Sequence, residues 1–181
     1  MLQNQKIKTT WAIDPVHTRI RFDAKYLMLS AVSGWFREVE GTVQAAGDDF
    51  NDSEIRLTIY ANSLFTGIDE RDDHLRSPDF FDAKKYPTIR FHSTAVSIDG
   101  DDLKIAGILS IKDIMQEIIV TAKYLGNVPD PMGNTKAGFE MDTIFDRKDF
   151  NITWNQFFDK QGILISDQVK LHADVQLLKL S

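Results

Sequence analysis

Apolar and polar residues alternate over long segments of the chain, and this pattern predicts β-strands with one apolar face. In the clearest segment, 19–26, Ile20, Phe22, Ala24 and Tyr26 share one face, while charged residues occupy the other. The same alternation recurs in the segments 54–61, 103–111, 117–125, 135–146 and 169–179. Two less regular segments, 32–44 and 88–98, bring the prediction to about eight strands.

Turn-forming residues separate these strands at 46–53, 99–102 and 127–134. Asp99-Gly100 between two strand patterns is a strong hairpin signal. Eight long, sequential antiparallel strands suit a closed barrel, because closure leaves no strand edge exposed. The predicted fold class is therefore all-β, an eight-stranded antiparallel barrel, and a two-sheet sandwich is the structural alternative.

Two strand segments have irregular features. Gly34 and Gly41 interrupt the segment 32–44 and predict a bulge or a sharp bend there. The segment 88–98 alternates only in part, through Ile89, Phe91, Ser93 and Ala95. We expect all four of these residues to face inward.

The segment 69–76 breaks the strand pattern and predicts a short helix. It opens with acidic residues, which a helix prefers in its first turn. Ser77-Pro78 follows, and the residue before a proline is pushed out of the helical conformation. We expect the helix to end there and the chain to return to a strand near residue 88.

Composition narrows the classes of protein. The 181 residues fit one domain, 1–181, with residues 1–10 as an N-terminal extension. The net charge of −6 disfavours a nucleic-acid partner, which would need clustered Lys and Arg. The chain has no cysteine, and its apolar runs are too short for stable membrane insertion. Since its first residues form no signal peptide, we expect a cytoplasmic protein, or a periplasmic one if a signal was removed.

Residues of the kind that carry catalysis occur without catalytic spacing. The four histidines, His17, His74, His92 and His172, form no metal-binding motif. There is no nucleophile elbow and no phosphate-binding loop. We therefore expect no enzyme, no catalytic residue, no metal site and no cofactor. An enzyme would require a polar pair beside a cavity, such as His17 with Asp14 or His74 with Asp72.

The apolar strand faces carry many aromatic residues. Five of them are Phe22, Tyr26, Phe91, Phe139 and Phe145. The interior of an eight-stranded barrel is either filled by side chains or open for one ligand. Small residues on the same faces would leave space between the rings: Ala24, Ser93, Gly107, Ala122, Ala137 and Ala173. The pattern favours an open lumen slightly and leaves a filled core possible.

Several collinear motifs resemble those of the YceI-like family. Trp11–Thr18 resembles its opening W-x-I-D-x-x-H-S, and Ser33–Phe36 resembles its G-x-F. Arg71–Leu75 resembles R-D-x-H-L, and Phe80-Phe81 followed by Tyr86–Ser93 resembles its F-F and Y-P-x-I-x-F-x-S. Arg147–Asn155 resembles the late R-x-D-F-G-I-x-W-N. The resemblance covers roughly residues 11–178, nearly the whole chain.

This resemblance implies an extended lipocalin-like barrel with one or two short helices and an elongated apolar pore that takes a polyisoprenoid. It also implies a homodimer. The expected function is to bind and carry or store a long apolar isoprenoid or similar lipid. The alternatives are an interaction module with a filled core and, less favoured, a lipid-modifying enzyme.

The expected site residues follow from the strand faces and the motifs. The expected pore lining comprises Phe22, Tyr26, Ile55, Leu57, Phe91, Leu109, Ile111, Val120, Phe139, Met141 and Phe145. The expected mouth or lid comprises Arg71, Asp72, His74 and Leu75. The alternative for Arg71, Asp72 and His74 is a hydrogen-bonded network that holds the helix to the barrel.

Three positions depart from the family pattern. Tyr26 stands where the family often has a histidine, and Asp113 and Asn151 replace turn glycines. Asn and Asp tolerate a positive φ better than most residues, so these turns are expected to persist. Tyr26 is expected to change a polar contact in or near the pore.

Overall fold

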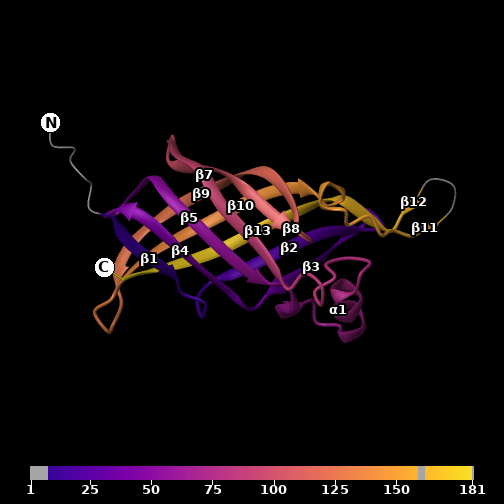
Figure 1. Ribbon diagram of the computed structural model, residues 1–181. Coiled ribbons are helices and arrows are strands. Elements are labelled where there is room, and N and C mark those ends of the chain that lie inside the picture. Colours follow the sequence, from indigo (N-terminus) through magenta and orange to yellow (C-terminus); the bar gives the residue numbers. More distant parts are fainter. Residues whose placement is uncertain (1–7, 159–161, 181) are drawn as a thin grey trace.

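A computed structural model describes residues 8–158 and 162–180. The strands are β1 (Thr9–Ile13), β2 (Arg19–Tyr26), β3 (Ser30–Phe36), β4 (Val39–Ala46), β5 (Asp49–Tyr60), β6 (Leu64–Phe65), β7 (Thr88–Asp99), β8 (Asp102–Ile111), β9 (Ile114–Pro129), β10 (Thr135–Asp146), β11 (Phe157–Phe158), β12 (Gly162–Ile163) and β13 (Ile165–Lys179). The helices are α1 (Asp69–Arg76) and two 3-10 turns, η1 (Ala61–Ser63) and η2 (Arg147–Phe150). Figure 1 shows an elongated barrel with α1 beside one end.

Hydrogen bonding closes the sheet into a ring of eight antiparallel strands. From β4 the order runs through β5, β7, β8, β9, β10 and β13, and β1 pairs with both β13 and β4. Along β13, β1 pairs with the C-terminal end and β2 with the remainder, so β1 and β2 act as one interrupted barrel strand. The eight-stranded barrel prediction is confirmed, and the sandwich alternative is wrong.

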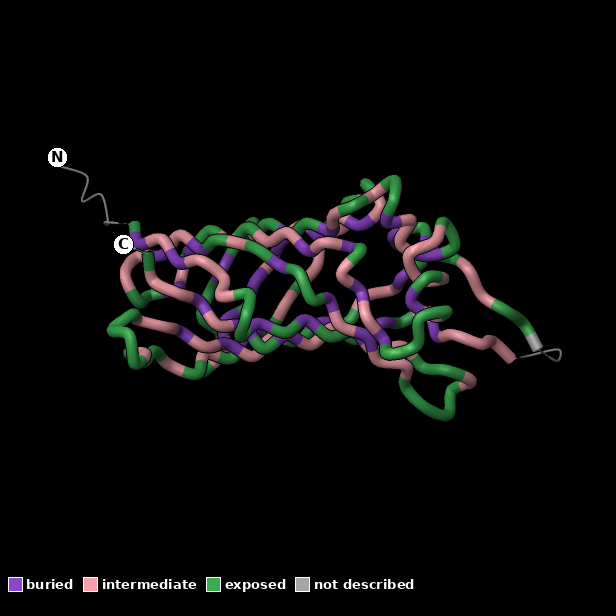
Figure 2. Tube along the Cα trace, turned by 90° about the horizontal axis from the view of Figure 1, so that it is seen from below, coloured by how far each residue is buried: buried purple, intermediate pink, exposed green. Residues whose placement is uncertain are grey.

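The strands are long enough to build a deep interior. β10 has 12 residues and β9 has 16. At about 3.4 Å per residue they span about 40–54 Å. With the usual tilt of roughly 35–45°, the barrel is about 30–40 Å tall. Figure 2 shows buried and more exposed residues alternating along the barrel strands, as a one-sided apolar face requires.

Several predicted boundaries agree with the structure. The segments 19–26 and 135–146 coincide with β2 and β10, and 69–76 coincides with α1. Asp99 pairs with Asp102 across the predicted hairpin. The interrupted segment 32–44 forms two strands, β3 and β4, on either side of a bend at Arg37-Glu38.

Other boundaries differ from the prediction. The stretch 46–53 is not a turn throughout, because β5 already begins at Asp49. Asp52 has a positive φ of 58°, and Phe50 before it is buried in the core. Ala95 faces outward, since a β-bulge after Ser93 shifts the register and turns Val96 inward. β1 begins at Thr9, within the expected N-terminal extension, whose residues 1–7 lie outside the described part.

Asp113 and Asn151, which stand where the family pattern has glycine, both have a left-handed backbone. Asp113 has a φ of 60° and forms a two-residue turn with Lys112, whose φ is 53°. Asn151 has a φ of 56° and ends η2. The family pattern of glycine at these two places therefore has a conformational reason, and the Asp and Asn residues of this chain keep both turns.

A charged network fixes the junction between β1 and β2. Asp14 Oδ2 lies 2.7 Å from Lys136 Nζ and 2.8 Å from His17 Nδ1, and the side chains of Asp14 and Lys136 are only 14% and 18% exposed. Burial raises the pKa of Asp14, but hydrogen bonds from Lys136, His17 and the Val16 amide outweigh it. Together they lower the pKa from 3.8 to about 2.

Replacing Asp14 by Asn is expected to destabilise the protein by about 2 kcal/mol at pH 7. Because the folded-state pKa lies below the unfolded value, the network stabilises the fold above about pH 4. This contribution is lost as the pH falls toward 2. Urea unfolding of the parent and of Asp14→Asn across this range measures the effect. A difference that stays constant down to pH 2 would show that ionisation of Asp14 contributes nothing.

Candidate ligand-binding lumen

The wider of two cavities in the barrel lies at the end that carries α1. This outer cavity has a volume of about 250 Å³ and an almost entirely apolar wall. Its wall is built from β2, β3, β5, β7, β8, β10, β13 and α1, and includes Phe22, Phe36, Ile111, Phe145 and Val169.

A second, narrower cavity continues the lumen away from α1. This inner cavity has a volume of about 110 Å³ and is lined by inward residues of β5, β7, β9 and β10, among others. Three residues, Ile59, Leu109 and Leu171, belong to the walls of both cavities. We call these three residues the waist. The two cavities are therefore contiguous, and together they extend along the barrel axis.

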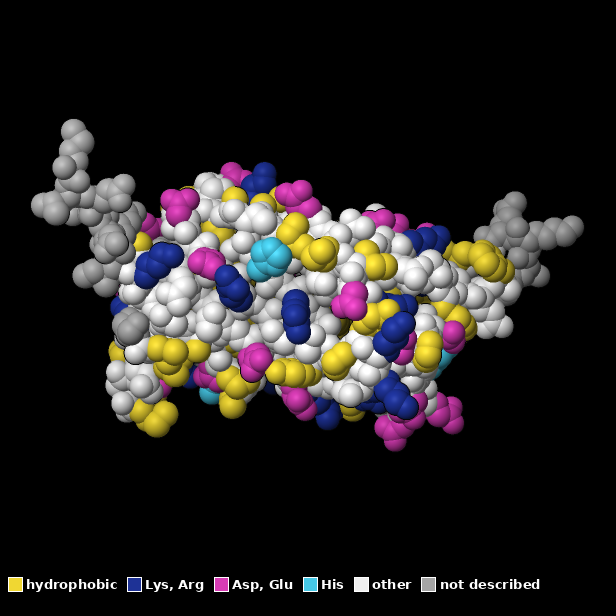
Figure 3. Space-filling view, in the orientation of Figure 1, with side chains coloured by type: hydrophobic (Ala, Val, Ile, Leu, Met, Phe, Trp, Pro, Cys, Tyr) yellow, Lys and Arg dark blue, Asp and Glu magenta, His cyan; other side chains and the backbone are white. Residues whose placement is uncertain are grey.

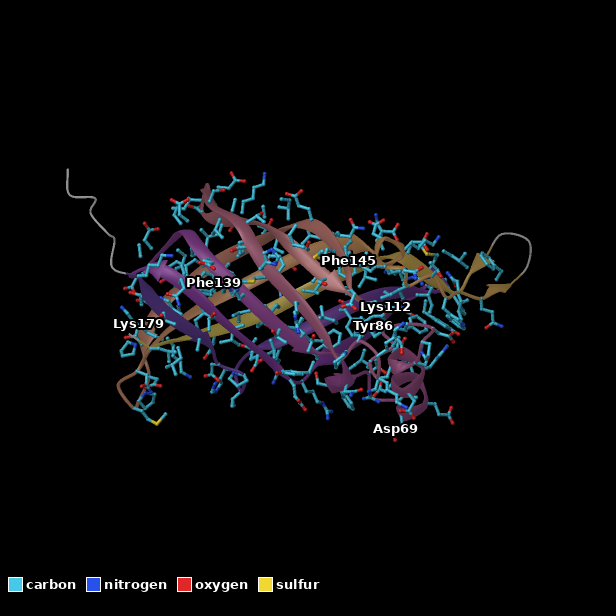
Figure 4. The ribbon with its side chains drawn as sticks, in the orientation of Figure 1. Asp69, Tyr86, Lys112, Phe139, Phe145 and Lys179 are labelled. Atoms are coloured by element: carbon cyan, nitrogen blue, oxygen red, sulfur yellow. The ribbon has the colours of Figure 1, made fainter. Side chains whose placement is uncertain are left out.

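The residues expected to line a pore all lie in these walls. The outer cavity is lined by Phe22, Tyr26, Ile111 and Phe145, the inner cavity by Ile55, Leu57, Phe91, Val120, Phe139 and Met141, and both by Leu109. Figure 4 shows Phe139 and Phe145 on β10, with Phe145 nearer the α1 end. Leu57, Val120 and Met141 face inward and yet are only half-buried, because they border open space.

Two glycines let aromatic rings lie flat against the barrel wall. Gly34 pairs with Phe22 across β2 and β3, and Gly107 lies beside Phe91 on β7. A Cβ on Gly34 would come within 2.2 Å of the Phe22 ring, and one on Gly107 within 2.3 Å of the Phe91 ring. Covering of a glycine by a cross-strand ring is a known feature of β-sheets. Here it holds two large rings against the barrel wall, where they line the lumen without crossing it.

The Gly34→Ala variant is expected to weaken lipid binding about fifteenfold, because the displaced Phe22 ring enters the outer cavity and excludes roughly two methylenes of ligand. The three atoms nearest to the new Cβ all belong to the Phe22 ring, so the fold should survive at a cost of about 1–3 kcal/mol. Titration with a fluorescent fatty-acid probe measures the change.

Adding Phe22→Leu in the Gly34→Ala background supplies the control, since leucine relieves the clash. Binding should recover in this double variant. If Gly34→Ala binds the probe as well as the parent does, the ring has another place to go and the explanation is wrong.

A roof of aromatic side chains covers part of the outer cavity. His74 of α1 makes edge-to-face contacts with Phe80 at 5.1 Å and with Trp154 at 4.7 Å between ring centroids. Phe80 and Trp154 are 5.4 Å apart, and Phe81 contacts Phe36 at 5.7 Å. We call His74, Phe80, Phe81 and Trp154 the roof. Of these, only His74 was expected at the mouth, although the motifs contain the other three.

Hydrogen bonds hold α1 in place beside the barrel. The buried Asp72 carboxylate accepts hydrogen bonds from the amide and hydroxyl of Thr66, and Arg71 donates to the Thr66 hydroxyl at 2.8 Å and carbonyl at 3.0 Å. Arg76 donates to the Leu64 carbonyl at 2.6 Å. Arg71, His74 and Leu75 line the outer cavity, whereas Asp72 does not. Arg71 and Asp72 therefore anchor the helix, while His74 joins the roof.

Arg147 organises the other side of the outer cavity. It is 3% exposed and donates hydrogen bonds to the carbonyls of Ser166, Ile152 and Trp154 at 2.8–2.9 Å. Burial lowers the pKa of Arg147, and the carboxylates of Asp167 and Asp146 oppose that effect. One side chain thus fixes the segment after η2, which carries Trp154, against the start of β13.

The mouth of the lumen lies beside the β2–β3 turn. Of the described residues that line the two cavities, Lys25 and Tyr26 are the ones exposed to solvent. In the turn that follows, Leu27 and Met28 have positive φ values of 53° and 56°, and the Leu27 amide donates to the Leu164 carbonyl at 2.8 Å. Figure 3 shows hydrophobic side chains gathered at the end of the molecule that carries β11 and β12. The entrance therefore combines apolar side chains with the polar ends of Lys25 and Tyr26, beside a turn with two left-handed residues.

Neither polar pair that an enzyme would need borders the lumen with both of its members. His17 does pair with Asp14, but neither lines a cavity. His74 Nε2 lies 2.8 Å from Asp79 Oδ2, and Asp72 is engaged with Thr66 instead. Among the described residues, no three His, Asp or Glu side chains are grouped so that they could hold a metal ion. Within the same residues, no helix is both long and apolar enough to cross a membrane.

The fold and its apolar cavities define a lipocalin-like barrel with an internal lumen. The family model described as the YceI-like domain matches residues 11–177, so the chain belongs to the YceI-like family. Protein YceI of Salmonella newport is 36% identical over 137 residues, which are 76% of this chain and 72% of that protein.

Two solved structures share the fold. Burkholderia cenocepacia BcnA has a TM-score of 0.79 at 21% identity and covers 91% of this chain and 98% of its own. A polyisoprenoid binding domain from Saccharophagus degradans has a TM-score of 0.68 at 14% identity and covers 94% and 98%. At these low sequence identities, the two comparisons show a similarity of fold.

Proposed function

We propose that this protein binds one long apolar lipid in its lumen, with a polyisoprenoid as the favoured class, and carries or stores it. The observation that carries the proposal is the contiguous pair of apolar cavities, about 250 and 110 Å³ in volume, that meet at the waist. The name of the Saccharophagus degradans domain supports the isoprenoid class.

Competition with a membrane explains why such a carrier needs an enclosed lumen. Burial of hydrocarbon is worth about 0.8 kcal/mol per methylene, and a bilayer offers the same gain. A protein that covers only part of the chain therefore loses to the membrane, since it also bears the entropic cost of association. Two cavities in series under an aromatic roof let the barrel cover a long chain.

The cavities also bear on the filled-core alternative. A filled barrel would bury every inward side chain against its neighbours, as tightly as a protein interior normally packs. Leu57, Met141 and Leu171 instead border open volume. The structure therefore favours a binding role over an interaction module with a solid core.

A binding role without turnover agrees with the polar groups near the lumen. Arg71 and Arg147 reach the outer cavity, but both use their donors on nearby backbone carbonyls and, for Arg71, the Thr66 hydroxyl. His74 also lines this cavity, and its Nε2 is paired with Asp79 Oδ2 at 2.8 Å. We accordingly propose that bound lipid leaves the protein chemically unchanged.

Organic extraction of the purified protein, followed by mass spectrometry, tests the proposal. We expect the extract to contain an isoprenoid or a similar lipid in a ratio of about one per barrel, since such a barrel holds one small ligand. Native mass spectrometry of the same sample should show the matching mass increase. A protein that repeatedly extracts empty, and that takes up no polyisoprenol from vesicles, would contradict the proposed function.

A further inference from the structure

Two buried aromatic rings line the inner cavity on the side away from α1. Phe50 of β5 and Phe139 of β10 line this cavity, and their ring centroids are 4.9 Å apart in an edge-to-face contact. Phe50 is 6% exposed and Phe139 is 3% exposed. The two rings come from strands on different sides of the barrel and meet across its interior, so they form a floor.

Two further aromatic residues pack behind this floor. Trp11 lies 5.4 Å from Phe50, and Tyr124 lies 5.5 Å from Phe50 and 5.1 Å from Phe139, between ring centroids. Neither Trp11 nor Tyr124 lines the inner cavity. Trp11 is fully buried, and its Nε1 donates to the Gly47 carbonyl at 3.2 Å. The end of the barrel away from α1 is thus closed by two layers of rings.

The lumen is therefore open at one end and blind at the other. Every described residue in the wall of the inner cavity is buried or half-buried, whereas Lys25 and Tyr26 in the outer wall are exposed. A chain that enters beside Tyr26 passes the waist and stops at Phe50 and Phe139. Tilted and edge-to-face contacts stabilise such an aromatic cluster beyond what the burial of its area contributes.

We infer that the Phe50–Phe139 floor is a chain-length ruler, which sets the longest hydrocarbon that the lumen encloses. The inference rests on the proposed lipid-binding function and adds the structural feature that selects lipids by chain length. Each methylene that enters the lumen tightens binding about fourfold. Once the chain reaches the floor, further methylenes remain outside in water and contribute nothing. A plot of affinity against chain length therefore has a break at the length that fills the lumen.

The test measures the affinity of straight-chain primary alcohols that differ by one methylene, by displacement of a fluorescent fatty-acid probe. The parent should gain about fourfold per methylene up to the break and then level off. In Phe50→Leu the smaller side chain deepens the lumen, and the break moves to longer alcohols with an unchanged slope. Phe65→Leu, the same substitution at a half-buried residue of β6 that lines neither cavity, is the matched control and leaves the break where it is.

Thermal unfolding confirms that each variant is folded, and Phe139→Leu probes the same floor from β10 if Phe50→Leu does not fold. If the break stays at the parent length in the folded floor variants, the ruler is wrong while lipid binding stands. If the parent shows no break and longer alcohols keep gaining affinity, the far end is open and the ruler is also wrong. If no alcohol of any length displaces the probe, the proposed function itself fails.

Discussion

The Arg147→Met variant is expected to lose about 3–5 kcal/mol of unfolding free energy, the largest effect on stability that the structure predicts for one residue. Methionine has a similar length but no donor, so the carbonyls of Ser166, Ile152 and Trp154 lose their partner. Each buried carbonyl left unsatisfied costs about 1–3 kcal/mol, reduced where water enters. Urea unfolding measures the loss.

The neighbouring Lys148→Met variant is the matched control. Lys148 Nζ also contacts Asp167, at 3.0 Å, but the lysine side chain is 50% exposed. Exposed ion pairs are worth about 0–1 kcal/mol, so this variant should stay within about 0.5 kcal/mol of the parent. If Arg147→Met is no less stable than Lys148→Met, the hydrogen bonds from Arg147 to the three carbonyls do not contribute to the free energy of unfolding.

Period-2 alternation predicts most strands of this barrel, but not β1, which begins within the expected N-terminal extension. Where the pairing is regular, as between β2 and β3 and between β10 and β13, inward residues pair with inward residues. The predicted bounds 19–26 and 135–146 then match the structure. Where a bulge inserts a residue, the pattern fails. At Asp52 and after Ser93, an irregularity in the strand reverses which alternate residues face inward. The alternation pattern therefore does not identify Phe50 as inward, and it places Ala95 on the wrong side.

The lumen was less predictable than the strands that form it. Alternation reports which face a side chain is on, but not whether facing side chains meet across the barrel. The rings of Phe22 and Phe91 lie against glycines because of the register between neighbouring strands, which a single strand pattern does not contain. The Phe50–Phe139 contact likewise joins strands that are distant in the sequence.

The alternation pattern does not predict the roof residues either, but for a different reason. Phe80, Phe81 and Trp154 lie in connecting segments without periodicity, where no strand or helix face marks them as buried. Their positions depend on α1, which Thr66 anchors, and on the segment that Arg147 holds. The motif resemblance was the available signal for these residues. It placed Phe80, Phe81 and Trp154 among the family-like positions without assigning them a role.

The Leu171→Trp variant is expected to abolish most lipid binding, with an affinity at least about a hundredfold weaker than the parent. Leu171 belongs to the waist, so a larger ring there closes the passage to the inner cavity. A chain excluded from the inner cavity loses the burial of several methylenes, each worth about 0.8 kcal/mol, and four of them account for roughly a hundredfold or more. Extraction and probe titration measure the effect.

The fold of Leu171→Trp should change little, because the added volume enters existing empty space and not a packed core. Ile144→Trp is the matched control, since Ile144 is 56% exposed on the outer face of the neighbouring strand β10 and should leave lipid binding intact. A Leu171→Trp protein that still copurifies with one long lipid per barrel would mean that the chain does not pass the waist. The ligand would then lie in the outer cavity alone, and the Phe50–Phe139 floor would not limit its length.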